Sequence, residues 1–303
     1  MVKNFSVLIP VYNFNVFPLV EQLDKIARHF DSSYEILLID DNSSSFFKEK
    51  NKTISSFKYV NYIELDKNIG RSKIRNLLFE IAKYKYCIIL DCDVLLAKEN
   101  FLTKYLDLLE DDNVIVGGHV YFPTPPKDKT KYLHWLYGRK IEVQNLEQRT
   151  FNDYASFMTN SFGISKNLFQ KLKFNESISE YGHEDTLFGF ELEKQKIPIV
   201  HINNPVVHLG IDNEEDFLNK QEKAIQNLVK LYKQGNYKNE LENNIKLIKF
   251  YNLFYNKFFY RFIIKIFTVK INFFKLILPF DFIKLSWLNL WKLKKFDYYF
   301  KND

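Results

Sequence analysis

The sequence predicts an α/β protein, in which a mostly parallel sheet is flanked by helices and followed by a helical extension. Short apolar runs alternate with stretches of helical periodicity through most of the chain. Polar clusters follow these runs, where a parallel sheet presents its carboxyl ends to ligands. Residues 246–303 differ from the rest because they are strongly basic and rich in aromatic side chains. These three observations carry the fold prediction.

The first hundred residues contain four expected strands, at 5–11, 34–39, 59–65 and 88–93. Residues 16–30 carry apolar side chains at helical spacing, and a second helix is expected from Gly70 to about residue 83. The polar cluster 40–45 is a turn that provides an N-cap for the helix after it. The alternation is that of a parallel sheet with helices on both faces.

The following residues continue the pattern less regularly. Residues 101–110 are an amphipathic helix, and 113–122 are a strand that contains a glycine pair. Prolines and lysines make 123–130 a loop, after which a strand is expected at 157–164. Glu184 and Asp185 open a helix that continues to about residue 196. The remaining elements are expected strands at 197–202 and 205–210 and a polar helix at 212–233.

The apolar run that begins at Ile88 ends in two carboxylates, Asp91 and Asp93, and another apolar run follows; we expect the first run to form a buried strand. Residues i and i+2 of a strand point the same way, so we expect both carboxylates to project side by side from its carboxyl end. Two such anions repel each other unless a cation lies between them. Hard oxygen ligands suit Mg²⁺ or Mn²⁺ that carries a phosphate substrate. The alternative is a surface turn with two solvated acids.

The chain has 303 residues, enough for one large domain or for one domain with an appendage. The only two cysteines, Cys87 and Cys92, do not suggest a disulfide framework, which favours a reducing compartment. The first residues lack the layout of a signal peptide. No stretch reaches 18 uncharged apolar residues, so no membrane-spanning helix is predicted. The expected location is therefore cytoplasmic.

Four motifs lie in order within about the first 95 residues: V-x-I-P-x-Y-N, L-L-I-D-D-N-S-S, N-x-G-x-x-x-x-R-N and I-L-D-C-D. Together they resemble the inverting family 2 glycosyltransferases, which have the GT-A fold. The resemblance implies a GT-A, Rossmann-like catalytic domain, which we place at residues 1–235. Residues 236–303 are then a C-terminal amphipathic segment.

The resemblance also implies a nucleotide-sugar site at these motifs. Asp41 matches the acid that bonds the base, whereas Asp40 is interpreted as structural, and Asp91 would reach the ribose or a metal. The other matching residues are, against the base, Pro10, Tyr12 and Asn13, and, toward the diphosphate, Asn68, Gly70, Arg71, Lys73 and Arg75. Independently, a diphosphate needs cations and exposed N–H groups, which a helix start after Gly70 supplies. The alternative is that Lys73 and Arg75 form a solvated helix face.

Gly182-His183-Glu184-Asp185 is similar to the catalytic motif of the family. The resemblance makes Asp185 the general base and Glu184 a residue that binds or orients the acceptor. A sugar hydroxyl is a poor nucleophile, so a carboxylate must take its proton as it attacks the anomeric carbon. The alternative is that both acids are present because the helix dipole favours them.

The metal ligands implied by the resemblance are Asp93, His208 and Asp91. His208 belongs to an H-x-G sequence, and an imidazole ligand favours Mn²⁺ over Mg²⁺. His208 packed in the core is the alternative, and His201 is the competing ligand.

Residues 246–303 hold 12 Lys and Arg against 3 Asp, and 19 of the aromatic residues. Basic residues lie four apart at Lys257, Arg261 and Lys265, opposite an aromatic face, and Trp287 and Trp291 repeat the spacing. A basic face opposite an aromatic face is typical of a helix lying on anionic lipid. One alternative is that these helices pack on the rest of the protein and form part of its ordinary core. Nucleic-acid binding is another, and no RNA- or DNA-reading motif accompanies it.

The sequence thus predicts a metal-dependent inverting transfer of sugar from a nucleotide-diphosphate donor, UDP-linked, to a saccharide hydroxyl. A tail on the inner membrane surface suits a lipid-linked acceptor, as in surface polysaccharide assembly. A non-catalytic membrane-bound scaffold is one alternative. A sugar-nucleotide pyrophosphorylase is another, but its glycine-rich G-x-G-T-R loop is replaced here by Pro-Val-Tyr-Asn after the first strand.

Overall fold

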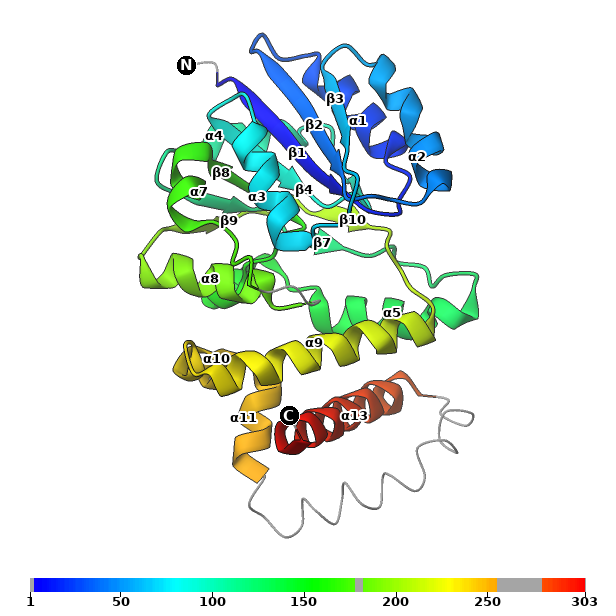
Figure 1. Ribbon diagram of the computed structural model, residues 1–303, viewed down its shortest axis with the longest axis vertical. Helices are drawn as coiled ribbons and strands as arrows, with labels where there is room; N and C mark the ends of the chain where they lie inside the picture. Colours follow the sequence, from blue (N-terminus) through cyan, green and yellow to red (C-terminus); the bar gives the residue numbers. More distant parts are fainter. Residues whose placement is uncertain (1–2, 178–181, 255–279, 303) are drawn as a thin grey trace. The chain divides into compact units, whose positions relative to one another are not determined.

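The computed structural model describes residues 3–177, 182–254 and 280–302 (Figure 1). It contains two compact units. The sheet unit comprises 1–124, 138–179 and 184–211, and the helical unit comprises 125–137, 180–183 and 212–303. The expected boundary near residue 235 does not coincide with this division, because helix 214–234 belongs to the helical unit. The extent of the catalytic domain stays a prediction.

The sheet unit is built on seven strands in the order β3-β2-β1-β4-β8-β6-β9. They are β1 (Phe5–Val11), β2 (Tyr34–Asp40), β3 (Val60–Glu64), β4 (Tyr86–Leu90), β6 (Val114–Val116), β8 (Ser161–Ser165) and β9 (Ile199–His201). The strands β1, β2, β3 and β4 pair in parallel, as do β6 and β9, whereas β8 runs antiparallel to both β4 and β6. The predicted mostly parallel sheet is confirmed.

Helices cover both faces of this sheet (Figure 1). On one face α1 (Phe17–Ala27) and α4 (Phe101–Leu108) pack against residues such as Val7 and Ile9 of β1. On the other face α3 (Arg71–Ile81), α7 (Lys166–Leu172) and α8 (Glu184–Lys194) pack on a cluster that includes Leu8. Successive side chains of a strand point to opposite faces, so an uninterrupted apolar strand fills both cores.

Two predicted strands end earlier than expected, and both predictions were wrong in this respect. The strand expected to end at Asp93 ends at Leu90, and the apolar run that follows Asp93 forms β5 (Val94–Leu96), which joins β7 (His119–Val120) and β10 (Val206–His208) in a separate three-stranded sheet. The run 113–122 breaks between β6 and β7 at its glycine pair. Gly118 has φ of 81°, and a side chain at Gly117 would collide with Tyr105, so only glycines fit this bend.

The helical unit contains α5 (Tyr132–Tyr137), α9 (Glu214–Gln234), α10 (Lys238–Asn244), α11 (Lys246–Phe254) and α13 (Asp281–Asn302). Its core includes Leu133, Phe217, Trp287 and Leu288. Among the described residues, the short helices not yet named are α2 (Ser45–Asn51), α6 (Leu146–Phe151), 3-10 turns at Lys52–Ser56, Lys129–Lys131 and Tyr154–Ser156, and a π turn at Gly138–Glu142.

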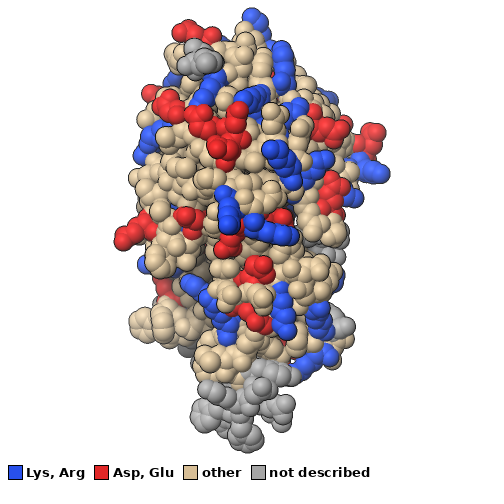
Figure 2. Space-filling view, turned by 90° about the vertical axis from the view of Figure 1, so that its left-hand side faces the viewer, with Lys and Arg blue, Asp and Glu red and all other residues tan. Residues whose placement is uncertain are grey.

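The expected aromatic membrane face is not present in α13 at Trp287, which is buried against Leu133 and Phe217 because α13 packs on α5 and α9. Lys257, Arg261 and Lys265 lie outside the described residues. None of the helices in the described part is both long and apolar enough to cross a membrane. On the face shown in Figure 2, acidic and basic side chains of the described residues lie interspersed.

Candidate active site

The turn between β4 and β5 carries Asp91 and Asp93, and it lies within the sheet unit together with the start of α3, the start of α8 and the end of β10. The backbone N–H of Asp91 donates to the carbonyl of Asn160, at 3.2 Å, which fixes the turn beside β8. Because the strand ends at Leu90, the two carboxylates follow turn geometry rather than strand alternation. Asp91 bonds to Arg75, whereas Asp93 lies against His208.

Arg75 connects two carboxylates that are far apart in the sequence. Its side chain is only 3% exposed, and its Nη2 donates to Asp91 Oδ1 at 2.8 Å. Its Nη1 lies 3.7 Å from Oε1 of the buried Glu184, which also receives Arg71 Nη1 at 3.3 Å. Arg75 is therefore not part of a solvated helix face, whereas Lys73, two residues earlier, is exposed.

The two arginines decide the charge state of these acids. Burial opposes ionisation, but Arg75 and Arg71 hold the pKa of Asp91 below its ordinary value. Burial likewise opposes ionisation of Glu184, whose pKa Arg71 and Arg75 hold below the ordinary range. Asp91 and Glu184 are thus ionised at neutral pH, and both arginines are oriented by them.

Asp185 has a different environment, although it is the next residue along α8. It lines a cavity of about 160 Å³ together with Thr186, Ser156 and Glu142. The Thr186 N–H donates to Asp185 Oδ1 at 2.7 Å. Burial, and then the charge of Glu184, raise the pKa of Asp185 to about 6. A carboxylate with a pKa near the working pH is well matched to accept a proton from a bound hydroxyl.

Asp93 and His208 form a pair of candidate metal ligands. Asp93 Oδ1 lies 3.6 Å from His208 Nδ1, and ligands of one octahedral Mg²⁺ or Mn²⁺ ion lie about 3 Å apart. A Cβ on Gly210 would lie 2.0 Å from Asp93 Oδ2. The glycine of the H-x-G sequence, which has no side chain, therefore leaves the space that the Asp93 carboxylate occupies. Burial, with a contribution from Asp91, raises the pKa of Asp93, which a bound cation would reverse.

The residues present fit a divalent cation in a limited way. Within the described ranges, no three His, Cys, Asp or Glu side chains gather at metal-ligand spacing, so the expected third ligand, Asp91, does not join the pair and remains with Arg75. Mg²⁺ and Mn²⁺ sites that carry phosphates use one or two protein carboxylates and complete their shell from substrate and water. His201, the competing ligand, is held by the carbonyl of Asp153 and by Arg149.

The predicted base-binding residues lie at the carboxyl ends of β1 and β2. Tyr12 is 53% exposed, and Asn13 has φ of 50°. The Asn13 N–H donates to Ser43 Oγ, and its Oδ1 accepts from the N–H of Ser44 at 2.8 Å. Pro10, the last-but-one residue of β1, is half-buried. These bonds join the two loops into one surface that leaves the Tyr12 ring exposed.

The Asp41 carboxylate accepts hydrogen bonds from the backbone at the start of α3. Its Oδ1 accepts from the N–H of Ile69 at 2.6 Å, and its Oδ2 accepts from Gly70 at 3.0 Å. The Asn68 side chain donates to its carbonyl. Burial raises the pKa of Asp41, even though the two N–H donors oppose this. Gly70, with φ of 86°, caps the helix in a conformation that favours glycine.

Asp40 accepts from the Ser43 N–H and from the Tyr62 hydroxyl, at 2.6 and 2.8 Å. Both bonds are internal to the turn and to β3, as expected for a structural acid. Sequence reasoning did not find the pairing of Arg75 with Glu184, nor the cavity-lining His119, Glu142 and Ser156. For the pairing of Arg75 with Glu184, the only signal in the sequence was the R-N pair that ends the third motif.

A sequence model described as "Glycosyl transferase family 2" matches residues 6–171 of this chain. Among curated proteins, the chain is 24% identical over 221 residues to "Glycosyltransferase GlyG" of Streptococcus pneumoniae, which covers 67% of this chain and 70% of that protein. It is also 24% identical over 229 residues to a chondroitin synthase of Escherichia coli, where the match covers 64% of this chain but only 33% of the synthase.

Two solved structures resemble the fold. The mannosyltransferase PcManGT from Pyrobaculum calidifontis, solved with GDP-Man and Mn²⁺, matches with a TM-score of 0.53 and 14% identity, over 79% of this chain and 67% of that one. S. aureus TarS residues 1–349, solved with UDP-GlcNAc, matches with a TM-score of 0.50 and 16% identity, over 80% of this chain and 76% of that one. These likenesses confirm the predicted GT-A fold.

Proposed function

Because the chain belongs to glycosyltransferase family 2, we propose that it transfers a sugar, with inversion, from a UDP-linked donor to a hydroxyl of a saccharide acceptor. Support for a nucleotide-sugar donor comes from the two structures of this fold, one holding UDP-GlcNAc and the other GDP-Man. The family match leaves the pyrophosphorylase alternative without support.

The observation that carries the proposal is the contrast between Glu184 and Asp185. The first is buried and neutralised by Arg71 and Arg75, and the second has its pKa raised to about 6 by burial and by that neighbour. Two adjacent carboxylates with opposite shifts indicate two different roles. Asp185 takes the proton of the acceptor hydroxyl in the cavity that it lines.

The remaining residues bind the donor and the acceptor. Arg71 is 53% exposed and is positioned by Glu184, so it can pair with a phosphate oxygen or an acceptor hydroxyl. Glu184 is proposed to orient the acceptor indirectly, by holding this arginine in position. The Nε and Nη1 of the buried Arg75 have no hydrogen-bond acceptor among the described residues. Tyr12, Asn13 and Asp41 lie where the base is proposed to bind.

Asp93 and His208 would hold Mn²⁺ or Mg²⁺, beside Asp91. When bound, the ion supplies a Lewis acid that neutralises the leaving diphosphate. The protein's own contribution is to place the Asp93 carboxylate, against which Gly210 leaves room, and to orient His208 through its contact with Tyr121, whose ring centroid lies 5.2 Å away.

We also propose a peripheral association with anionic membranes and a lipid-linked acceptor, as in surface polysaccharide assembly. In support, Phe280 and Phe282 at the start of α13 are 65% and 79% exposed, and Phe250 and Leu253 of α11 are exposed as well. Flotation with vesicles that contain anionic lipid tests this in the full chain. Phe280→Ser/Phe282→Ser should float less than the wild type, and equal flotation would refute the role of these side chains.

The experiment for the transferase itself is a screen of nucleotide sugars for Mn²⁺-dependent release of nucleoside diphosphate. The wild type is compared with Asp185→Asn, and with Glu193→Gln as a control on an exposed position of the same helix. We expect one donor to be turned over by the wild type and the control, and at least 100-fold more slowly by Asp185→Asn. If every donor is inert, Mn²⁺-dependent UDP binding that is lost in Asp93→Ala still supports a donor site. If folded protein shows neither, the proposal fails and a non-catalytic scaffold remains.

A further inference from the structure

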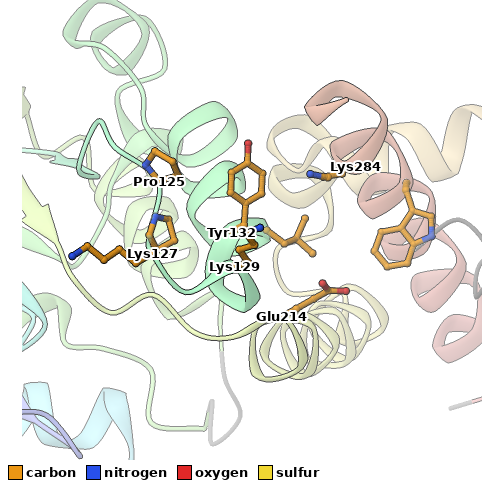
Figure 3. A pocket seen from close by; sticks show the side chains of 9 residues that line it. Pro125, Lys127, Lys129, Tyr132, Glu214 and Lys284 are labelled. Carbon is orange, nitrogen blue, oxygen red and sulfur yellow. The ribbon is translucent and has the colours of Figure 1, made fainter. Parts of the chain in front are cut away.

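A larger cavity, of about 490 Å³, lies within the helical unit (Figure 3). Three segments line it: residues 125–133, Glu214 at the start of α9, and the first two turns of α13. None of these residues belongs to the four motifs or to the candidate active site. The volume is within the range of about 300–1,000 Å³ that is typical of small-molecule sites.

The walls of this cavity are mostly apolar. They are formed by Pro125, Pro126, Tyr132, Leu133 and Trp287. Leu133 and Trp287 belong to the buried core of the unit, so these walls are fixed by packing. The Tyr132 hydroxyl contacts both carboxylate oxygens of Asp281, at 2.9 and 3.1 Å, which ties the start of α13 to α5. The cavity is therefore a formed feature of this unit.

The lining also carries an excess of positive charge. Lys127, Lys129 and Lys284 contribute three ammonium groups, and Glu214 is the one acid among the lining residues. Figure 3 shows Lys127 and Lys129 on the loop side and Lys284 across from them on α13. Of the acids beside the lining, Asp128 bonds to Thr130, and Asp281 lies 3.8 Å from Lys284. Because Asp281 offsets Lys284 in part, the positive charge that complements an anion comes mainly from the two loop lysines, Lys127 and Lys129.

An apolar wall and a basic lining together select the ligand. A free sugar or inorganic phosphate would leave the apolar surface unused, and a neutral hydrocarbon would make no use of the charges of Lys127 and Lys129. We infer that this cavity binds a phosphate-bearing aliphatic chain, with the chain against Tyr132, Leu133 and Trp287 and the phosphate at the lysines. The exposed Phe280 and Phe282 precede Lys284 by four and two residues. These exposed aromatic side chains are therefore close in the sequence to a residue that lines the cavity. A lipid that enters the cavity from a membrane would need such an apolar surface.

This inference deepens the proposed function, because the phosphate-bearing chain would be the lipid part of a lipid-linked acceptor. It rests on that function only for the ligand's role in the reaction, since binding requires no donor and no turnover. Apolar contact and charge both contribute, so affinity should depend on both chain length and lysines. Each buried methylene is expected to tighten binding about fourfold, and each lysine about fivefold.

The test is calorimetric binding of monomeric octyl and decyl phosphate to the full chain, with decanol and inorganic phosphate as separate ligands. Lys127→Gln/Lys129→Gln is the test variant, and Lys67→Gln/Lys98→Gln, exposed in the sheet unit, is the matched control. We expect decyl phosphate to bind about 15-fold more tightly than octyl phosphate, and about 25-fold more weakly to the test variant alone.

Four results would overturn the inference. Inorganic phosphate that binds as tightly as decyl phosphate would indicate an anion site only. Decanol that matches decyl phosphate, with no effect of the lysines, would indicate an apolar surface only. Loss of decyl phosphate binding in Phe280→Ser/Phe282→Ser would place it on the exposed surface. Transfer to a water-soluble saccharide without decyl phosphate binding refutes this inference alone, whereas binding without any transfer refutes the proposed function alone.

Discussion

Replacing Arg75 by Met tests the electrostatic arrangement of the candidate site most directly. The change keeps an apolar stem of similar length but removes the charge that lies 2.8 Å from Asp91 and 3.7 Å from Glu184. Breaking a buried ion pair by removing one partner costs about 3–5 kcal/mol, because the other partner stays buried without compensation. Arg71 still lies 3.3 Å from Glu184, so the charge left without compensation is mainly that of Asp91.

The loss should depend on pH in a defined direction. In the wild type, Arg75 and Arg71 hold the pKa values of Asp91 and Glu184 below their ordinary values. That contribution is present above the unfolded-state pKa values and is lost as the pH falls through the folded ones. Without Arg75, burial raises the pKa of Asp91, so this acid takes up a proton on mild acidification. The difference in unfolding free energy should shrink by about 1 kcal/mol or more between about pH 7.5 and pH 5.

Urea unfolding followed by far-UV circular dichroism at both pH values measures this difference. Lys73→Met is the matched control, because the residue is exposed two positions earlier on the same helix. It should change the free energy of unfolding by less than about 0.5 kcal/mol. A loss in Arg75→Met that is equal at both pH values would refute the assignment of Arg75 as the counter-charge of buried acids.

Three further predictions concern other parts of the site. The transfer rate should fall about tenfold per pH unit below pH 6, because the Asp185 carboxylate, with its pKa raised to about 6, must be deprotonated to act as a base. A value of kcat/KM that stays constant down to about pH 5 would exclude Asp185 as the general base. Gly210→Ala should displace Asp93 and weaken Mn²⁺-dependent UDP binding at least tenfold in calorimetry, and unchanged binding would show that this carboxylate is not a ligand. Asp41→Ala should lower the free energy of unfolding by about 1–3 kcal/mol in urea titrations, since two N–H groups at the start of α3 lose their acceptor; a change below about 0.5 kcal/mol would contradict its capping role.

Much of the sheet could be predicted because its signals are local. The runs 5–11 and 34–39 are apolar on both faces, and the observed β1 and β2 agree with them within one residue. The breaks at Asp91–Asp93 and Gly117–Gly118 could not be predicted in the same way. Periodicity does not record which sheet a strand joins, and β10 pairs with β5 and β7, which both lie more than 80 residues earlier in the chain.

The candidate site shows the same division. Motif residues such as Asp93, Asp185 and His208 were found from their order along the chain, and the structure brings Asp93 and His208 together. The tail prediction failed at Trp287, because a basic and aromatic helix has the same pattern whether its apolar face packs on a membrane or on another helix. Only packing decides between them.

The sequence by itself determined the alternation of strands and helices, the family and the positions of the acids, because each depends on neighbouring residues. Tertiary structure alone decided which acids are neutralised. Glu184 and Asp185 are adjacent in sequence and chemically similar, but α3 brings Arg71 and Arg75 against the first, whereas burial and the charge of Glu184 raise the pKa of the second in its cavity. Charge state depends on burial and on counter-charges from distant parts of the chain, which no local pattern encodes.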